Sequence, residues 1–317
     1  MKTSAVVLQA PQDLVLGQLE LDSAGDNDLI VDIDYSGIST GTEKLLWTGR
    51  MPSFPGMGYP LVPGYESVGQ VVSAGANARH RVGDHVFVPG ARCFGPVRGL
   101  FGGAAARLVV NDERVYDIDD SLGESAVLLA LAATAYHAVS GGGKRNPIVP
   151  PDLIIGHGVL GRLLARLTVA AGLPPPTVWE REPLRHEGAQ GYEVVQPDAD
   201  PRRDYRSIYD VSGDVRILDT AIPRLVKGGE VVLAGFYAEP LSFNFAPAFM
   251  REAQIRAAAE WQRPDMLAVK QLAEEGRLDL GDLITHRERA EHASDAYRTA
   301  FSDSACLKMV LDWRSCQ

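Results

Sequence analysis

Residues 152–161 read Asp152-Leu153-Ile154-Ile155-Gly156-His157-Gly158-Val159-Leu160-Gly161, a short apolar run that ends in a glycine-spaced turn. The apolar residues before the turn predict a strand, and those after it predict a helix. Gly156 allows a backbone conformation that a side chain would forbid, Gly158 lets the main chain approach a pyrophosphate, and Gly161 lets the helix pack close to the strand. The start of the helix adds free N–H groups and a positive dipole end. The residues that we expect to bind a dinucleotide here are Gly156, His157, Gly158, Val159, Leu160 and Gly161.

The residues after this turn fit the same prediction. Apolar residues continue at helical spacing from Leu163, and Gly172 stands where a helix C-cap would fall. Thr177-Val178-Trp179-Glu180 then predicts a second strand that ends in a carboxylate. Glu180 lies 180 − 161 = 19 residues past the last glycine, near the roughly 20-residue offset at which an acidic residue meets the ribose hydroxyls of NAD. The alternative is an ordinary strand, turn and helix with incidental glycines, and this context favours the nucleotide site.

Two residues at this site leave alternatives open. Arg181 is a cofactor-binding candidate because an arginine here can pair with the 2′-phosphate of NADP. Glu180 would repel that phosphate, so the sequence favours NAD. His157 lies inside the turn, where its side chain either touches the pyrophosphate or fills a variable position.

Length and composition limit the function classes. The chain has 317 residues, enough for two domains, with 45% hydrophobic and 23% charged residues. Its net charge of −10 argues against nucleic acid as a general partner. The longest apolar stretch, 126–136, is too short to span a bilayer, and the N-terminus shows no cleavage signal. We therefore expect a cytoplasmic protein without a membrane span. Its three cysteines have no ligand spacing.

The pattern of predicted elements changes along the chain. Short apolar or alternating runs bounded by turns fill residues 4 to about 88 and predict a compact β-rich domain. Residues 92–103 have the composition of a loop, and 107–110 predict a strand again. A helical pattern over 121–139 follows, and glycines at 141–143 interrupt it. From residue 152 to 235 strands alternate with helices, which predicts a parallel sheet. Two further helices, 264–276 and 290–301, precede a last strand at 306–312 that we expect to return to the first domain.

Residues 47–63 form a segment with aromatic and methionine side chains among prolines and glycines. Such a composition predicts no long regular structure. The segment is either a surface loop with buried anchors or a loop that lines an apolar pocket, and the sequence does not decide between the two. Its candidate contact residues are Trp47, Met51, Phe54, Met57 and Tyr59.

Several segments resemble the medium-chain dehydrogenase/reductase family over nearly the whole chain. Gly37-Ile38-Ser39-Thr40-Gly41-Thr42-Glu43 is similar to the family's segment in which a cysteine zinc ligand precedes Gly-Thr-Asp. Gly64-Tyr65-Glu66-Ser67-Val68-Gly69 resembles its Gly-His-Glu-x-x-Gly, 83–86 its Gly-Asp-x-Val, and 229–232 its late strand. The resemblance implies an α/β fold with a GroES-like β-rich N-terminal domain and a doubly wound Rossmann-type domain. We place them at 1–125, completed by about 264–317, and at 126–263, with a homodimer as an expected assembly.

Residues 36–47, 49–52 and 54–69 are similar to one branch of that family. Its members oxidise the 3-(1-hydroxyethyl) group of a chlorin or bacteriochlorin to acetyl with NAD. The resemblance therefore implies a large, flat tetrapyrrole substrate. The loop at 47–59 would suit such a substrate because aromatic and methionine side chains supply adaptable apolar contact. Arg50 is the nearest candidate partner for a propionate.

This sequence departs from the family at the positions of the catalytic metal. Thr40 stands at the cysteine position and Tyr65 at the histidine position, and the structural-zinc lobe keeps only Cys93. Zinc prefers thiolate, imidazole or carboxylate ligands, so we expect no catalytic and no structural zinc.

Without a metal, hydroxyl groups and water must handle the proton of the alcohol. Thr42 occupies the family's proton-relay position, and we expect Tyr65 to donate a hydrogen bond to the developing alkoxide. Glu66 is a third catalytic candidate, although a structural acceptor is its commoner role. Glu43 carries the same structural expectation.

Two other functions remain open at this stage. One is a quinone-reductase-like enzyme that reduces an activated double bond with NADPH, which Glu180 argues against. The other is a nucleotide-binding protein without catalysis, because loss of metal ligands is also what an inactive enzyme would show. A measured cofactor preference would distinguish the NADPH-dependent reductase from an NAD-dependent dehydrogenase. An activity assay would distinguish the non-catalytic protein from an enzyme.

Overall fold

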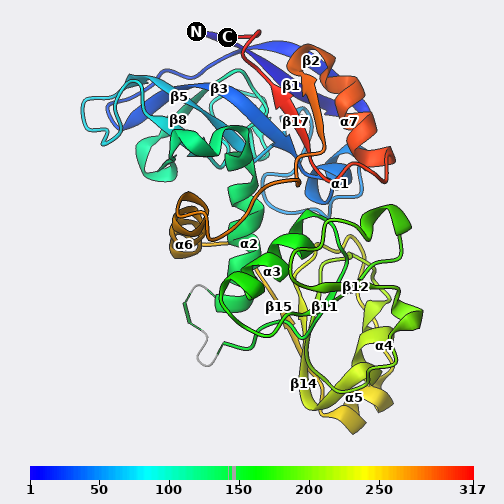
Figure 1. Cartoon of the computed structure of the whole chain (residues 1–317). Coiled ribbons are helices and arrows are strands. Elements are labelled where there is room, and N and C mark those ends of the chain that lie inside the picture. The colour runs from blue at the N-terminus through cyan, green and yellow to red at the C-terminus, as the bar shows by residue number, and fades with distance from the viewer. Residues whose placement is uncertain (142, 145–147) are drawn as a thin grey trace. The chain divides into compact units, whose positions relative to one another are not determined.

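The computed structural model describes residues 1–141, 143–144 and 148–317 (Figure 1). Its contacts divide the chain into two compact units. Unit 1 contains residues 1–130 and 283–317, and unit 2 contains residues 131–282.

The second boundary lies after Asp282, whereas the sequence placed it near 264. The difference is helix α6 (Arg263–Glu274), which belongs to unit 2. Asp265 in its first turn is hydrogen-bonded to His137 Nδ1 at 2.7 Å and to Ser140 Oγ at 2.9 Å. Both partners lie on helix α2 (Leu129–Ser140), so these buried contacts hold α6 to the second unit.

Unit 1 is a β-rich fold with two sheets. A four-stranded sheet has the order β2-β1-β4-β7, and a seven-stranded sheet has the order β16-β17-β3-β5-β6-β9, with β8 also paired to β3. Alternation explains β3, because Leu29, Val31 and Ile33 are fully buried while their neighbours are not. The strands are β1 (Lys2–Ala10), β2 (Asp13–Glu20), β3 (Asp28–Ile38), β4 (Leu61–Val62), β5 (Ser67–Ala74), β6 (His85–Val88), β7 (Arg98–Gly99), β8 (Arg107–Asn111), β9 (Tyr116–Asp117), β16 (His286–Arg289) and β17 (Met309–Asp312).

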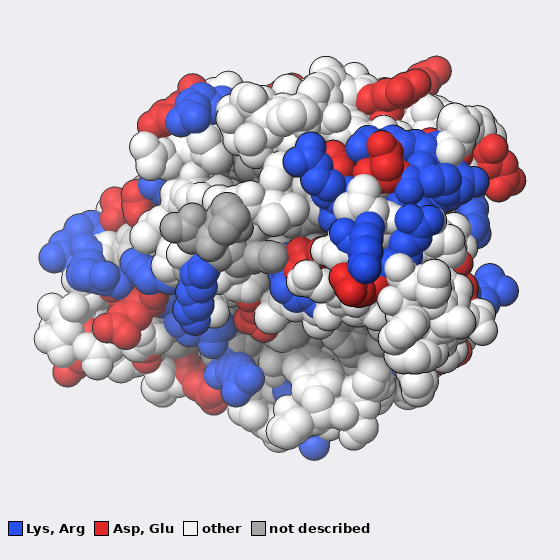
Figure 2. Space-filling view, turned by 90° about the horizontal axis from the view of Figure 1, so that it is seen from below, with Lys and Arg blue, Asp and Glu red and all other residues white. Residues whose placement is uncertain are grey.

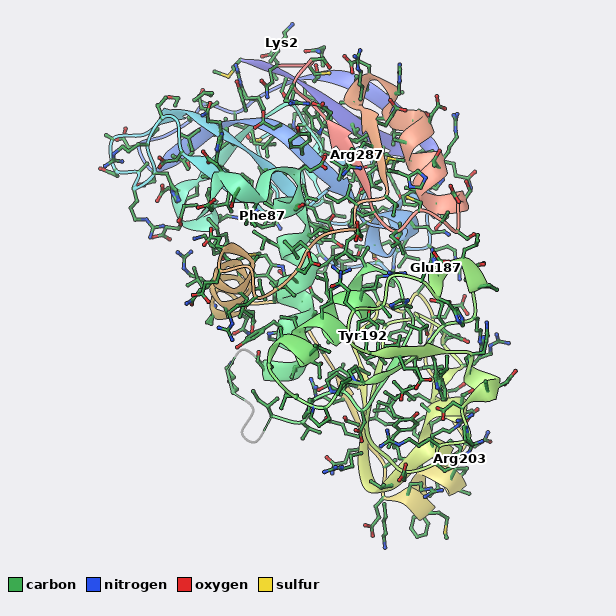
Figure 3. All side chains as sticks on the ribbon, in the orientation of Figure 1. Lys2, Phe87, Glu187, Tyr192, Arg203 and Arg287 are labelled. Atoms are coloured by element: carbon green, nitrogen blue, oxygen red, sulfur yellow. The ribbon has the colours of Figure 1, made fainter. Side chains whose placement is uncertain are left out.

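The C-terminal strand returns to the first unit as expected. β17 pairs antiparallel with β3, from Met309 opposite Ile38 to Asp312 opposite Tyr35. Arg287 of the C-terminal part, labelled in Figure 3, forms an ion pair with Glu124 of the N-terminal part of the same unit, with Nη2 2.5 Å from Oε1. The helices of this unit are α1 (Thr42–Thr48), α7 (Ala293–Ser302), and the 3-10 helices η1 (Asp112–Arg114), η2 (Asp120–Leu128) and η6 (Ala290–His292).

Unit 2 is a six-stranded sheet with the order β12-β11-β10-β13-β14-β15, and every pairing in it is parallel. In chain order this is 3-2-1-4-5-6, the arrangement of a doubly wound dinucleotide-binding fold. The predicted fold class is therefore confirmed. The strands are β10 (Leu153–Ile155), β11 (Thr177–Trp179), β12 (Glu193–Val195), β13 (Tyr205–Asp210), β14 (Leu225–Leu233) and β15 (Gln254–Ala257).

Helices accompany this sheet. Besides α2 and α6 they are α3 (Val159–Ala170), α4 (Ile217–Ala221), α5 (Phe245–Arg251), η3 (Pro183–Arg185), η4 (Pro197–Ala199) and η5 (Ile222–Arg224). The helix predicted over 121–139 is present as η2 followed by α2. The glycine interruption expected after it falls partly on residue 142, which lies outside the described residues.

One stretch in the described part of the chain, Asp120–Ser140, is long and apolar enough to cross a membrane by those two criteria. Within it, 56% of the most apolar window is buried inside the protein. Gly123 also departs from helical geometry, with φ 47° and ψ −133°. Because a buried core helix meets the same criteria, we assign this stretch to the core.

Charged side chains of both signs share the face shown in Figure 2, where Lys and Arg gather at the upper right and at the left, in each place beside Asp and Glu. Several such groups are paired on the surface, for example Arg202 with Asp204 at 2.8 Å. Exposed pairs of this kind stabilise a fold little, typically by less than about 1 kcal/mol. We therefore interpret these charged side chains as an ordinary surface in contact with solvent.

Candidate nucleotide and substrate sites

The glycine turn has the geometry that the sequence predicted. Gly156 follows β10 with φ +107°, a conformation that favours glycine. A side-chain carbon on Gly161 would lie 1.9 Å from the Gly156 carbonyl oxygen, so α3 can pack against the turn only with glycine there. At Gly158, the N-cap of α3, a side-chain carbon would meet nothing within 4 Å. Open space at Gly158 beside the start of a helix fits a pyrophosphate.

The first turn of α3 supplies the donors. Val159 is its first residue and is buried, and Leu160 is partly exposed. The N–H groups of Val159, Leu160 and Gly161 precede the first intrahelical bond, which Arg162 N–H donates to the Gly158 carbonyl. These residues therefore fit a bound dinucleotide.

Glu180 lies directly after β11 and its carboxylate is held in place by main-chain donors. Its Oε2 accepts from His157 N–H at 2.9 Å, and its Oε1 accepts from Arg181 N–H at 2.7 Å and Glu182 N–H at 2.8 Å. The structure thus brings Glu180 next to the glycine turn, as the spacing predicted. The Arg181 guanidinium is exposed, and its Nη1 lies 3.9 Å from Asp214 Oδ2.

The imidazole of His157 is fully buried. Its Nδ1 lies 2.5 Å from the Arg185 carbonyl oxygen, and its Nε2 lies 2.8 Å from the hydroxyl of Tyr192. Figure 3 labels Tyr192. A carbonyl oxygen only accepts, so Nδ1 carries the proton and Nε2 accepts from Tyr192. Burial lowers the pKa of His157 to about 4, which keeps the ring neutral. The His157 side chain therefore links the glycine turn to Arg185 and Tyr192 by hydrogen bonds, and its main-chain N–H donates to Glu180.

Arg162 is a residue of this site that the sequence analysis did not single out. It is almost fully buried in the first turn of α3. Its Nε donates to the His157 carbonyl at 3.1 Å, and its Nη2 donates to the carbonyls of Arg185 and Glu187. Arg162 therefore fastens the segment after Glu180 to the glycine turn. The available signal was an arginine among the apolar residues of the predicted helix, with Arg166 one turn later on the same face.

A second group that the sequence analysis missed lies at the carboxyl ends of β13 and β14. Asp210 is fully buried and accepts hydrogen bonds from Ser212 N–H at 3.1 Å, from Ser212 Oγ at 2.6 Å and from the Tyr237 hydroxyl. Burial raises the pKa of Asp210. Ligands of such sheets bind beyond the carboxyl ends of the strands, so this group borders the expected nucleotide site.

In unit 1 the structure brings three hydroxyl groups together. The Tyr65 hydroxyl donates to Ser39 Oγ at 2.6 Å, and the Thr42 side chain is also hydrogen-bonded to Tyr65. The Tyr65 ring packs edge-on against Phe101, with 5.5 Å between ring centroids. Burial and then the charge of Glu66 raise the pKa of Tyr65 far above its ordinary value, so its hydroxyl keeps its proton. Thr42 and Tyr65 were predicted, whereas Ser39 was not.

Glu66 lies beneath this group in a buried ion pair. Its Oε2 is 2.5 Å from Lys308 Nζ, which also donates to the Ile38 carbonyl at 3.3 Å. A side-chain carbon on Gly37 would lie 2.1 Å from the same carboxylate oxygen, so Gly37 makes room for the pair. Burial raises the pKa of Glu66, and Lys308 opposes that rise. This geometry favours the structural alternative for Glu66.

The donor groups at the positions of the family's metal ligands do not fit zinc. Thr40 and Tyr65 offer hydroxyls, which bind zinc poorly. Within residues 1–141, 143–144 and 148–317, no three His, Cys, Asp or Glu side chains come together in a way that could hold a metal ion. Cys93 is buried, and burial raises the pKa of its thiol to about 11.

The predicted substrate loop contains several buried anchors. The Trp47 ring packs against Tyr297 and Phe301, with centroid distances of 6.4 Å and 6.1 Å. Met51 belongs to the core of unit 1, and the Tyr59 hydroxyl donates to the Leu46 carbonyl. These contacts favour the anchored-loop alternative for those three residues. The remaining candidates are Phe54 and Met57, which are partly buried, and Arg50, which is exposed.

Comparison with known proteins agrees with this geometry. Residues 25–120 match the family described as Alcohol dehydrogenase GroES-like domain. The chain is 57% identical over 320 residues to 2-desacetyl-2-hydroxyethyl bacteriochlorophyllide A dehydrogenase of Cereibacter sphaeroides, and 58% identical over 315 residues to the protein of the same description from Rhodobacter capsulatus. Each comparison covers 99% of this chain and 99% of the relative.

A solved structure shows the same fold. It is an alcohol dehydrogenase of Escherichia coli CFT073 complexed with NADH, which matches with a TM-score of 0.82 at 21% sequence identity. The match covers 98% of this chain and 99% of that chain. The arrangement of a GroES-like unit and a doubly wound unit is therefore shared with dehydrogenases.

Proposed function

This chain belongs to the medium-chain dehydrogenase/reductase family, and from that premise we propose that it oxidises the 3-(1-hydroxyethyl) group of a chlorophyllide or bacteriochlorophyllide to 3-acetyl with NAD and without zinc. The reaction would be a step of bacteriochlorophyll a biosynthesis. The full-length similarity to two relatives with this substrate in their description supports the substrate class. The observation that supports a reaction without zinc is that the hydroxyl groups of Ser39, Thr42 and Tyr65 lie together and are hydrogen-bonded, as a hydroxyl cluster.

The residues of unit 2 would hold NAD, which supplies the hydride acceptor when bound. The glycine turn and the first turn of α3 would bind the pyrophosphate through main-chain N–H groups. Glu180 would accept hydrogen bonds from the ribose hydroxyls. Its carboxylate would repel the 2′-phosphate of NADP, and the nearby Asp214 partly offsets the charge of Arg181. These charges favour NAD.

The hydroxyl cluster of unit 1 would handle the alcohol oxygen. Tyr65 keeps its proton and donates it to Ser39 Oγ, so the Tyr65 oxygen would accept a hydrogen bond from the alcohol before the reaction. As the alcohol proton moves to the Tyr65 oxygen, the Tyr65 proton would pass to Ser39 Oγ and the Ser39 hydroxyl proton would pass on to water. Tyr65 would then hold the former alcohol proton and donate it in a hydrogen bond to the oxygen on which negative charge develops. Thr42, which is also hydrogen-bonded to Tyr65, would orient its ring. Burial, and after it the charge of Glu66, keeps Tyr65 neutral by raising its pKa.

Phe54, Met57 and Arg50 complete the proposal on the substrate side. The two apolar side chains would contact the macrocycle, and the guanidinium would pair with a propionate. Trp47, Met51 and Tyr59 would shape that surface through their anchoring contacts. The homodimer and the cytoplasmic location stay predictions, which the molar mass in solution and cell fractionation would test.

The first prediction is the reaction itself. Purified protein mixed with NAD and a hydroxyethyl bacteriochlorophyllide is expected to give the red-shifted absorption of the acetyl product together with NADH. With NADP at the same concentration we expect a rate at least about tenfold lower, because Glu180 disfavours the extra phosphate. Correctly folded protein that binds NAD and gives no spectral change would instead favour the non-catalytic alternative. Tighter binding of NADPH than of NADH would favour the double-bond reductase.

A further inference from the structure

A second buried carboxylate, Glu43, lies behind the hydroxyl cluster on α1. Its side chain has no exposed surface. Its Oε1 accepts from Ser39 N–H at 3.1 Å, and its Oε2 is bonded to the Tyr297 hydroxyl at 2.6 Å. Tyr297 lies on α7 and is itself buried against the rings of Trp47 and Phe301. The Ser39 N–H and the Tyr297 hydroxyl are both neutral donors.

The charges around Glu43 do not balance. The buried charged groups that face it are Glu66, ahead of β5, and Lys308, ahead of β17, and the titratable hydroxyls are Tyr65 and Tyr297. Lys308 is committed to Glu66 at 2.5 Å. Two buried carboxylates therefore share one buried ammonium group. A buried carboxylate without a cation is costly, and the usual relief is protonation.

Ser39 connects Glu43 to the site of the proposed reaction. Its main-chain N–H donates to Glu43, while its hydroxyl accepts from Tyr65. An ionised Glu43 would hold that N–H by a charge-assisted hydrogen bond, which is about twice as strong as the bond to a neutral carboxyl. The position of the Ser39 hydroxyl, and through it that of Tyr65, thus depends on the charge of Glu43.

We propose that Glu43 is a positioning residue whose effect depends on its own protonation. When Glu43 is protonated, the buried ammonium group of Lys308 balances Glu66. When Glu43 is ionised, it holds Ser39 in place as the hydrogen-bond acceptor for Tyr65. The proposal rests on the proposed function, because it assigns Glu43 a part in the handling of the alcohol proton. It adds to that function a reason for the hydroxyl cluster to respond to pH.

The direction of the pH effect follows from the same contacts. Burial raises the pKa of Glu43 to about 7, with Tyr297 and Ser39 lowering it and Glu66 raising it. The folded protein therefore carries Glu43 mostly protonated below that value and mostly ionised above it. Alcohol oxidation should increase as the pH rises through about 7, because the ionised form holds Ser39 in place.

The experiment measures kcat/KM for alcohol oxidation with NAD at pH values from about 6 to about 8 in the full chain. A single ionisation near 7 predicts a rise of about tenfold over this range in the wild type. The change should be less than about twofold in Glu43→Gln. In Tyr297→Phe the inflection should move to higher pH, because a hydrogen bond that lowers the pKa is lost. The matched control is Glu20→Gln, which removes an exposed carboxylate and should leave the profile unchanged.

A purely structural role for Glu43 would lower activity without moving the inflection, and that result would overturn the proposal. The protonation itself is checked without substrate, by infrared difference spectra of the protein between about pH 6 and about pH 8. The wild type should lose a carboxylic acid band that Glu43→Gln lacks, and a band that persists in Glu43→Gln would also contradict us. If the wild type shows this band but makes no acetyl product at any pH, the proposed function fails while the proton assignment of Glu43 stands.

Discussion

Tyr65→Phe is expected to lower turnover about 100-fold and to leave NAD affinity within about twofold of the wild type. Removing one preorganised donor to a developing oxyanion costs roughly 10²–10³ in kcat. The variant loses the hydroxyl that donates to Ser39 at 2.6 Å, but keeps the ring that packs against Phe101. The protein should therefore fold, with a loss of about 1 kcal/mol in the free energy of unfolding for the missing hydrogen bond.

Single-turnover kinetics and NAD titration of the variant separate these two effects. Tyr35→Phe is a matched control, because it removes a tyrosine hydroxyl from the same unit while the ring keeps its contact with the Arg314 guanidinium. We expect Tyr35→Phe to turn over like the wild type. Wild-type turnover in Tyr65→Phe would remove Tyr65 from the mechanism.

Glu180→Ala is expected to weaken NAD binding by about 10- to 100-fold, which corresponds to roughly 1.4–2.7 kcal/mol. The substitution removes the acceptor for the ribose hydroxyls, and hydrogen bonds to charged groups contribute about 1.5–3 kcal/mol. It also leaves the N–H groups of His157, Arg181 and Glu182 without their acceptor. Calorimetric titration with NAD measures the loss.

The change in NADP affinity separates a lost ribose contact from a loosened turn. Loss of the Glu180 charge should raise the affinity for NADP relative to NAD, whereas a loosened turn would weaken both alike. Glu182→Ala is the control, since that carboxylate accepts from the Leu184 N–H at 3.3 Å and not from the N–H groups that hold Glu180. An unchanged dissociation constant for NAD in Glu180→Ala would contradict the assignment of the nucleotide site.

The nucleotide site could be predicted from the sequence because its signals are local. Gly156, Gly158, Gly161 and Glu180 all lie within one strand, turn, helix and strand, and the structure joins Glu180 to the turn through the His157 N–H. The environment of the His157 ring was not predictable, because Arg185 and Tyr192 reach it from a later segment.

The hydroxyl site was predicted only in part, because its supporting contacts join distant parts of the chain. Lys308 meets Glu66 across 242 residues of sequence, and Tyr297 meets Glu43 across 254. No periodicity or spacing rule connects such positions. Ser39 was missed for a related reason, since its role depends on the Tyr65 hydroxyl, 26 residues further along. Family resemblance supplied Thr42 and Tyr65, and the pairing of β17 with β3 brings the C-terminal residues to them.

The central claim is that a hydroxyl cluster replaces a catalytic metal. Its most direct test is turnover of hydroxyethyl bacteriochlorophyllide with NAD by protein treated exhaustively with a chelator, with the metal content measured in the same sample. We predict wild-type turnover at far less than one zinc per chain, because Thr40 and Tyr65 offer zinc poor ligands. About one tightly bound zinc per chain, whose removal abolishes turnover and whose return restores it, would contradict the claim.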